Sequence, residues 1–184
     1  MIKMYHNPVL LKESIIGLNI NPNGIYVDAT FGGGGHSTEI LNKLNSSGRL
    51  IAFDQDQDAI DNKILDNRVS LVKSNFKYLN NYLNYFEINK IDGLLADFGI
   101  SSYQIDNEKR GFSTRFDSEL DMRMNNSQKT DAKAVVNDYK KDQLEEKLKE
   151  IIEKFKRNEP PEKINYEGYF RKNLNLDIKF LKDE

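Results

Sequence analysis

Apolar residues follow two alternating patterns along the first hundred positions. Short runs of four or five mostly apolar residues are separated by longer segments in which apolar residues recur every three or four positions. Runs of the first kind favour buried strands, and segments of the second kind favour amphipathic helices. Strands are predicted at 25–29, 50–54, 69–72 and 91–97, and helices at 8–19, 37–44, 58–65 and 75–86.

The order of these elements predicts the class of fold. Strand and helix alternate until the fourth strand, which is typical of a parallel sheet covered by helices. We therefore predict an α/β fold. Sheets of this kind bind ligands beyond the carboxyl ends of their strands, so we look for candidate chemistry there.

The alternation stops after Asp97. Residues 98–130 are predicted to be an extended, largely loop-like segment. One more helix is predicted at 141–156, because Leu144, Leu148, Ile151, Ile152 and Phe155 form one apolar stripe. The tail, 162–184, shows no clear period.

Composition and charge narrow the classes of function. The 184 residues include no cysteine and only His6 and His36 as histidines, so disulfides and thiolate chemistry are excluded and no metal site is expected. No signal peptide and no membrane-spanning run is recognisable, which favours a cytoplasmic location without membrane contact. The net charge of -2 argues against strong non-specific binding to nucleic acid, although it is compatible with a local basic patch.

A run of four glycines, 32–35, separates the first strand from the helix that follows it. Glycine lets the backbone approach a ligand closely, and the next helix offers free N–H groups at its N-terminus. A dinucleotide phosphate or a methionine carboxylate would fit such a loop, and a structural turn without a ligand is the plainer alternative. Ser37 stands where the dinucleotide fingerprint requires its third glycine, which disfavours a nicotinamide-dependent oxidoreductase.

Asp28, Asp54 and Asp97 each fall at the carboxyl end of a predicted strand. Asp54 could accept hydrogen bonds from ribose hydroxyls, and we predict Asp58 as the cap of the following helix. Asp97 could accept a hydrogen bond from a substrate amine and orient its lone pair toward an electrophilic methyl group. A buried or capping aspartate is the structural alternative.

Two more residues are candidates with a strong structural alternative. His36 could act as a base or contact a cofactor, but it could equally be an ordinary first-turn residue. Phe76 follows the third strand and could lie against an adenine ring, whereas most residues of this kind belong to a core.

Several long segments, in order, resemble the bacterial 16S ribosomal RNA cytosine-N4-methyltransferases, the MraW family. The resemblance covers residues 5 to about 145. It rests on Tyr5–Glu13, Tyr26–Ser37, Asp92–Ser102 and Glu108–Asp117, the last continuing to Leu120–Met124.

The resemblance implies a Rossmann-like class I methyltransferase that uses S-adenosyl-L-methionine and methylates the exocyclic N4 of a cytosine at the decoding centre of the small ribosomal subunit. Its partner would be 16S rRNA within that subunit, and a homodimer stays an open alternative. Segment 110–124 would shape the substrate side. The implied cofactor contacts are Gly34, Gly35, His36, Asp54, Phe76, Asp97 and Gln104, of which Asp97 is also the implied catalytic residue.

The chain departs from the family near its C-terminal end. Members are longer and insert a helical substrate domain after the fourth strand, whereas here the match fades after about residue 145. We predict a cofactor-binding domain over 1–130 and, over 131–184, a helical segment like the start of that insert plus a divergent tail. The sheet is expected to be incomplete. A truncated, non-catalytic remnant that binds the cofactor or a partner is therefore the alternative function.

Overall fold

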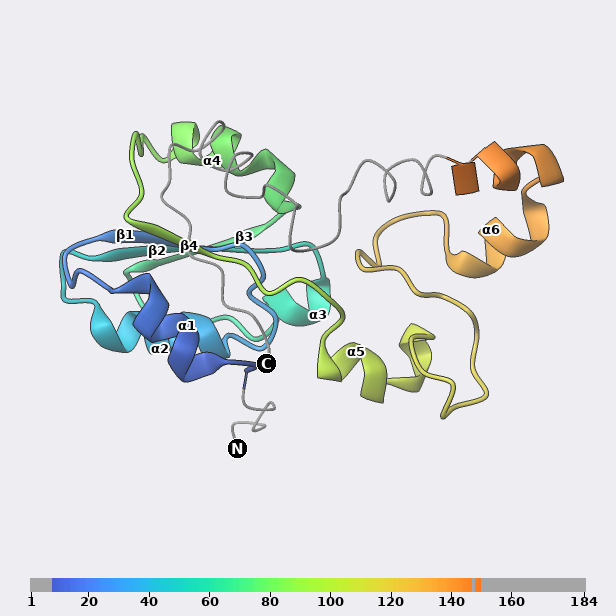
Figure 1. Cartoon of the computed structure of the whole chain (residues 1–184), viewed down its shortest axis with the longest axis horizontal. Helices are drawn as coiled ribbons and strands as arrows, with labels where there is room; N and C mark the ends of the chain where they lie inside the picture. The colour runs from blue at the N-terminus through green and yellow to red at the C-terminus, as the bar shows by residue number, and fades with distance from the viewer. Residues whose placement is uncertain (1–7, 147, 150–184) are drawn as a thin grey trace. The chain divides into compact units, whose positions relative to one another are not determined.

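The computed structural model describes residues 8–146, 148 and 149. A four-stranded, all-parallel sheet in the order β3-β2-β1-β4 lies between two layers of helices (Figure 1). Helices α1 and α2 cover one face and α4 covers the other. The predicted α/β fold of the Rossmann-like kind is confirmed. The strands are β1 Ile25–Asp28, β2 Arg49–Asp54, β3 Val69–Lys73 and β4 Gly93–Leu95.

The central strands are apolar on both faces because helices cover both faces of the sheet. Val27, Leu50, Ile51 and Phe53 are fully buried. Helices α1 Leu11–Leu18 and α2 Gly35–Lys43 pack their apolar sides against the core on one side, through residues that include Ile15, Leu18, Ile40 and Leu41. Leu44, the C-cap of α2, belongs to the same cluster. These elements agree with the predicted ones to within a few residues.

Arg68, just before β3, fixes the C-terminal end of α2. Its guanidinium donates to the carbonyl oxygens of Leu41 at 3.1 Å and Leu44 at 2.7 Å, and it pairs with Asp66 at 2.6 Å. The hydrogen bonds from Arg68 lower the pKa of the Asp66 carboxyl to about 2. These contacts satisfy carbonyls that the helix itself leaves unpaired.

Helix α3 is shorter than predicted and has a different cap. It covers only Gln57–Ile60, and the Asp56 side chain, not that of Asp58, accepts from the backbone as its N-cap. The prediction of Asp58 as the cap was therefore wrong by two positions. The amide of Asn62 donates to the carbonyl of Asp58 at 3.1 Å, a local side-chain bond of the kind that competes with helix continuation.

The fourth predicted helix begins as a 3₁₀ turn. Residues Phe76–Tyr78 form the turn η1, and α4 follows at Leu79–Tyr85. Asn75 sets the start of the turn by accepting from the backbone N–H of Lys77 at 2.9 Å. Phe76 is thus the first residue of the 3₁₀ turn and lies three residues after the end of β3.

The prediction of a largely loop-like segment over 98–130 was partly wrong. Two short helical turns lie in it, α5 Ser102–Asp106 and η2 Glu108–Arg110. Each begins with a polar cap: the Ser101 hydroxyl accepts from the N–H of Gln104, and the Asn107 side chain accepts from the N–H of Lys109. Caps of this kind make single turns without any apolar periodicity, so the pattern could not reveal them.

Helix α6, Ala132–Asp138, was also not predicted. Asp131 caps it by accepting from the N–H of Ala134 at 2.7 Å. Residues 141–146 and 148–149 are helical, in agreement with the predicted helix at 141–156. The rest of that helix and the tail at 162–184 lie outside the described residues.

The described chain divides into two compact units. The first contains the sheet and extends to Asp106, with the addition of Met124–Asn126, and the second contains Asn107–Arg123 and the described residues from Ser127 onward. The division into domains at residue 130 stays a prediction. Of the helices in the described part, none is long and apolar enough to cross a membrane.

Polar contacts hold the second unit together. The carbonyl of Asp121 accepts from the N–H of Ala132 at 2.8 Å, while its carboxylate pairs with Arg123 at 2.6 Å. The guanidinium of Arg110, which is buried, donates to the carbonyl of Arg123 at 2.8 Å. Gly111 has a φ of 67°, and a Cβ there would lie 2.6 Å from the Glu119 carbonyl oxygen.

Candidate functional site

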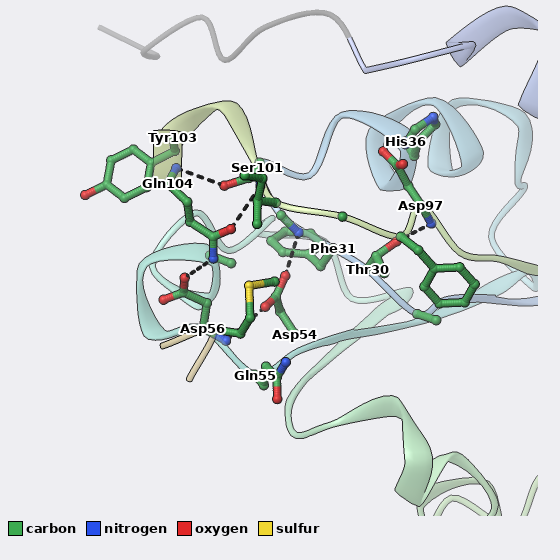
Figure 2. A pocket seen from close by; sticks show the side chains of 18 of the residues that line it. Thr30, Phe31, His36, Asp54, Gln55, Asp56, Asp97, Ser101, Tyr103 and Gln104 are labelled. Atoms are coloured by element: carbon green, nitrogen blue, oxygen red, sulfur yellow. Dashed lines mark hydrogen bonds between the residues drawn. The ribbon is translucent and has the colours of Figure 1, made fainter. Parts of the chain in front are cut away.

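A cavity of about 630 Å³ lies where the strands of the first unit end. Its walls come from the segments that follow β1, β2, β3 and β4, together with α5 and the residues just before α1 (Figure 2). This is the position at which parallel α/β sheets bind ligands. Of the residues expected at the site, Gly35, His36, Asp54, Phe76, Asp97 and Gln104 line the cavity.

The glycine loop forms one wall of the cavity, and its glycines serve different needs. Gly32 and Gly34 adopt left-handed conformations with φ of 52° and 78°. A Cβ on Gly35 would lie 2.3 Å from Cγ of Pro8. Gly34 is packed against the ring of Phe31 and does not appear in the cavity wall. Gly34 and Gly35 are therefore required by packing, whether or not a ligand is present.

Asp54 joins the glycine loop to the end of β2. One carboxylate oxygen accepts from the N–H of Gly32 at 2.8 Å and the other accepts from the N–H of Asp56 at 2.9 Å (Figure 2). Burial raises the pKa of this carboxyl above its ordinary value, and these two backbone hydrogen bonds oppose the rise. Asp54 lines the cavity while it supports the loop.

Asp28 lies behind the cavity wall. It is fully buried, and its carboxylate accepts from the Ser37 hydroxyl at 2.7 Å and from the N–H of Thr30 at 3.1 Å. Burial raises the pKa of this carboxyl. Of the three strand-end acids, Asp54 and Asp97 reach the cavity, and Asp28 instead ties the first turn of α2 to the end of β1.

Asp97 is exposed on the cavity wall, two residues beyond the end of β4. Its backbone N–H donates to the Thr30 hydroxyl oxygen at 2.8 Å (Figure 2). Within the described part of the chain, no hydrogen bond or ion pair occupies its carboxylate. The group is therefore available to a ligand with a positive charge or an N–H donor.

Two phenylalanines are in contact at the cavity, although they follow strands at opposite edges of the sheet. Phe76 follows β3 and Phe98 follows β4, which are the two edges of the sheet. Their ring centroids nevertheless lie 5.6 Å apart, and the side chains are 39% and 57% exposed. The segment after β4 must therefore run back across the strand ends. Exposed rings on a cavity wall can contact a planar ligand.

His36 and Gln104 make contacts within the protein. Nε2 of His36 donates to the carbonyl of Val9 at 3.1 Å, which holds the segment before α1 against α2. The buried amide of Gln104 donates to Asp56 at 2.7 Å and accepts from the N–H of Ser101 at 2.9 Å (Figure 2). Both side chains border the cavity, and their roles toward a ligand stay predictions.

Sequence reasoning missed Thr30 and Phe98 as parts of this site, and it missed Ser37 as the hydrogen-bond partner of Asp28 behind the cavity wall. Thr30 bonds Asp97, which is 67 positions away in the chain, and Ser37 bonds Asp28, which is 9 positions away. Nothing in the apolar pattern distinguishes these two residues. Phe98 could have been suspected, because it adjoins Asp97 after a strand. Its contact with Phe76 depends on how the chain crosses the sheet.

Comparison with known proteins identifies a family that this chain matches. The profile of the MraW methylase family matches residues 3–166. Relatives named ribosomal RNA small subunit methyltransferase H are 59% identical over 140 residues in Christiangramia forsetii and 54% identical over 140 residues in Flavobacterium johnsoniae. Each alignment covers 76% of this chain and 46% of the relative. The relative of the same name from Cytophaga hutchinsonii is 56% identical over 138 residues, which cover 74% of this chain and 46% of that protein.

The chain thus spans about half the length of the curated relatives that it matches. The matched region includes the glycine loop and every strand-end acid, and the family profile extends over most of the chain. Together with the parallel sheet and the cavity at its carboxyl edge, this shows that the chain belongs to the MraW methylase family.

Proposed function

We propose that this chain carries the donor site of an S-adenosylmethionine-dependent methyltransferase that modifies N4 of a cytosine in 16S rRNA. The relatives' names support a substrate in the RNA of the small ribosomal subunit. The choice of N4 rests on the sequence resemblance together with one observation: the Asp97 carboxylate lies on the cavity wall, and no hydrogen bond from the described residues occupies it.

The residues present fit S-adenosylmethionine. A cavity of about 630 Å³ is of the size that small-molecule sites usually have. The cofactor carries a sulfonium and an ammonium group, and four aspartates, Asp54, Asp56, Asp58 and Asp97, line this cavity. Phe76 offers an exposed ring for adenine, and the glycine loop lets the backbone approach the methionine part.

Asp54 would hold the ribose. Its oxygens already accept two backbone N–H bonds, and a carboxylate has about four lone-pair sites, so it can accept ribose hydroxyls as well. The same bonds fix the carboxylate before a ligand arrives. A fixed acceptor loses little conformational entropy when the ligand binds.

Asp97 would act on the substrate amine. When bound, the cofactor supplies an electrophilic methyl group on a positively charged sulfur. The Asp97 carboxylate accepts a hydrogen bond from the exocyclic amine, which directs the nitrogen lone pair toward that methyl group. As the N–C bond forms, the S–C bond of the cofactor would break with its electron pair left on sulfur. The nitrogen would then lose a proton, and this carboxylate would accept it. Orientation in the cavity supplies much of the rate of such a transfer.

Calorimetric titration with S-adenosylmethionine tests the donor site. We expect the wild type to bind in the micromolar range and Asp54→Ala to lose on the order of 2 kcal/mol of binding free energy, as for a charged hydrogen-bond acceptor. Because Asp54 also supports Gly32, Asp54→Asn is a useful second variant, since it keeps one acceptor oxygen. Asp61→Ala, at an exposed site just after α3, is the matched control. Equal affinity of Asp54→Ala and wild type would exclude the ribose role.

The alternative function is a remnant that binds the cofactor without catalysis. Transfer of a labelled methyl group to small subunits that lack the modification distinguishes the two. Incorporation at N4 of a cytosine, lost in Asp97→Ala, supports the enzyme, and binding without incorporation supports the remnant.

A further inference from the structure

Thr30, on the cavity wall, joins the end of β1 to the turn that carries Asp97. Its hydroxyl oxygen accepts from the N–H of Asp97 at 2.8 Å, and its own N–H donates to the carboxylate of Asp28 at 3.1 Å. Asp28 in turn accepts from the Ser37 hydroxyl at 2.7 Å. A continuous set of bonds thus runs from the first turn of α2 to Asp97.

The residues on either side of Thr30 fix its backbone. The N–H of Ala29 donates to Leu95 in β4 at 2.8 Å, and the N–H of Phe31 donates to Phe53 in β2 at 2.8 Å. The chain at Thr30 is therefore held from both neighbouring strands. The backbone of Thr30 cannot shift away from Asp97 without breaking one of these bonds.

Asp97 needs such an anchor because its own surroundings hold it weakly. It lies beyond the last residue of β4, is exposed, and is followed two residues later by Gly99 with a φ of 152°. The backbone there has the freedom that glycine gives. Within the described chain, the bond to Thr30 is the hydrogen bond that fixes the Asp97 backbone.

We propose that Thr30 is a positioning residue that holds the Asp97 carboxylate on the cavity wall, where its negative charge favours the sulfonium of S-adenosylmethionine over the neutral thioether of the demethylated product. The inference rests on the proposed function, since it takes S-adenosylmethionine to occupy the cavity. It adds a residue, Thr30, and a property, preference for the methylated cofactor over its demethylated product.

The ratio of two affinities measures this property. S-adenosylmethionine and S-adenosylhomocysteine share adenine, ribose and amino acid, and they differ by one methyl group and the charge on sulfur. A change in fold or in loop packing weakens both ligands together. A change in the Asp97 carboxylate alters the ratio of their dissociation constants.

Calorimetry with both ligands on five proteins tests the proposal. Asp97→Asn should reduce the preference for the charged cofactor roughly tenfold, because the carboxylate charge that attracts the sulfonium across a hydrated cavity is lost. Thr30→Val keeps the shape but lacks the hydroxyl, and should reduce the preference roughly threefold to tenfold, because Asp97 loses its backbone anchor. Thr30→Ser restores the hydroxyl and should restore the ratio.

Thr38→Val is the matched control. Thr38 also bonds the backbone through its hydroxyl, to the Gly34 carbonyl at 2.7 Å, but it is exposed and outside the cavity wall. Its ratio should equal that of the wild type. Thr30→Ala serves as a smaller variant where valine prevents folding.

The possible results distinguish the role of Thr30, the role of Asp97 and the proposed function from one another. A wild-type ratio in Thr30→Val, or in Thr30→Ala, beside a reduced ratio in Asp97→Asn would overturn the role of Thr30 and leave the proposed function standing. An unchanged ratio in Asp97→Asn would overturn the role of Asp97, and the inference with it. A wild type that binds neither ligand would overturn the proposed function itself. Failure of both hydroxyl-free variants to fold, beside a folded Thr30→Ser, would show a structural hydroxyl and overturn the positioning role.

Discussion

Three aspartates at equivalent places in the sheet have three different environments. Asp28 is fully buried, Asp54 is partly buried under the glycine loop, and Asp97 is exposed on the cavity wall. Burial raises the pKa of the first two carboxyls. A residue at a strand end therefore acquires its role from the depth at which the neighbouring loop places it.

Substitution of Asp28 by asparagine should change how stability depends on pH. The folded-state pKa of Asp28 is raised above 3.8, so its contribution to stability is fully present below 3.8 and is lost as pH rises through the raised pKa. We expect the wild type to gain stability relative to Asp28→Asn as pH falls from 7 toward 4, by about 1.4 kcal/mol for each unit of pKa shift. Urea unfolding at several pH values measures this difference.

Asp61→Asn, at an exposed position, is the control for that experiment and should keep a nearly constant difference from wild type. A constant difference for Asp28→Asn as well would mean that burial does not shift this carboxyl.

At the level of elements, the glycine loop links β1 and β2 to α2. Its N–H groups bond β2 and the carboxylate of Asp54, and α2 begins at Gly35. The glycines differ in what they require. A Cβ on Gly32 would find no atom closer than 3.9 Å, whereas a Cβ on Gly34 would lie 3.0 Å from the ring of Phe31.

Alanine at these two glycines should therefore have unequal effects on stability. In Gly32→Ala the only penalty is that alanine must adopt the left-handed backbone conformation, which costs about 1–2 kcal/mol. Gly34→Ala suffers the same strain and also displaces the ring of Phe31, so its free energy of unfolding should fall further. Chemical denaturation measures both.

Gly32→Asn should recover part of the loss, because asparagine tolerates the left-handed region better than alanine. Equal losses in the two alanine variants would contradict the role assigned to the Phe31 contact.

At the level of the whole molecule, apolar burial is concentrated in the first unit. Every buried hydrophobic side chain of the described residues lies at or before Leu95, and in the second unit the buried side chain is the charged Arg110. Hydrogen bonds and ion pairs with exposed partners contribute little net stability, so the two units should differ in resistance to opening.

Native-state hydrogen exchange should show this difference. We expect amides in β1 and β2 to be strongly protected and amides in 107–123 and 132–138 to exchange at least about a hundredfold faster, as in regions with few buried apolar contacts. Mass spectrometry of peptides from the two units gives the measurement. Similar protection in both units would show that the second unit has a stability of its own that its polar contacts do not explain.

The apolar pattern by itself determined the parallel α/β sheet, because buried strands and amphipathic helices differ in period and both are long enough here to show it. It also located the cavity, since the carboxyl ends of parallel strands share one edge. The short turns at 102–106 and 108–110 and the helix at 132–138 escaped it, because their polar caps carry no period.

Only the tertiary structure decided how the candidate residues divide between chemistry and support. The sequence placed Asp28, Asp54 and Asp97 alike, and depth in the fold separated them. The bond from Thr30 to Asp97 and the ring contact of Phe76 with Phe98 join residues from different strands. Such contacts depend on the distance between strands in space, which the local order of residues does not encode.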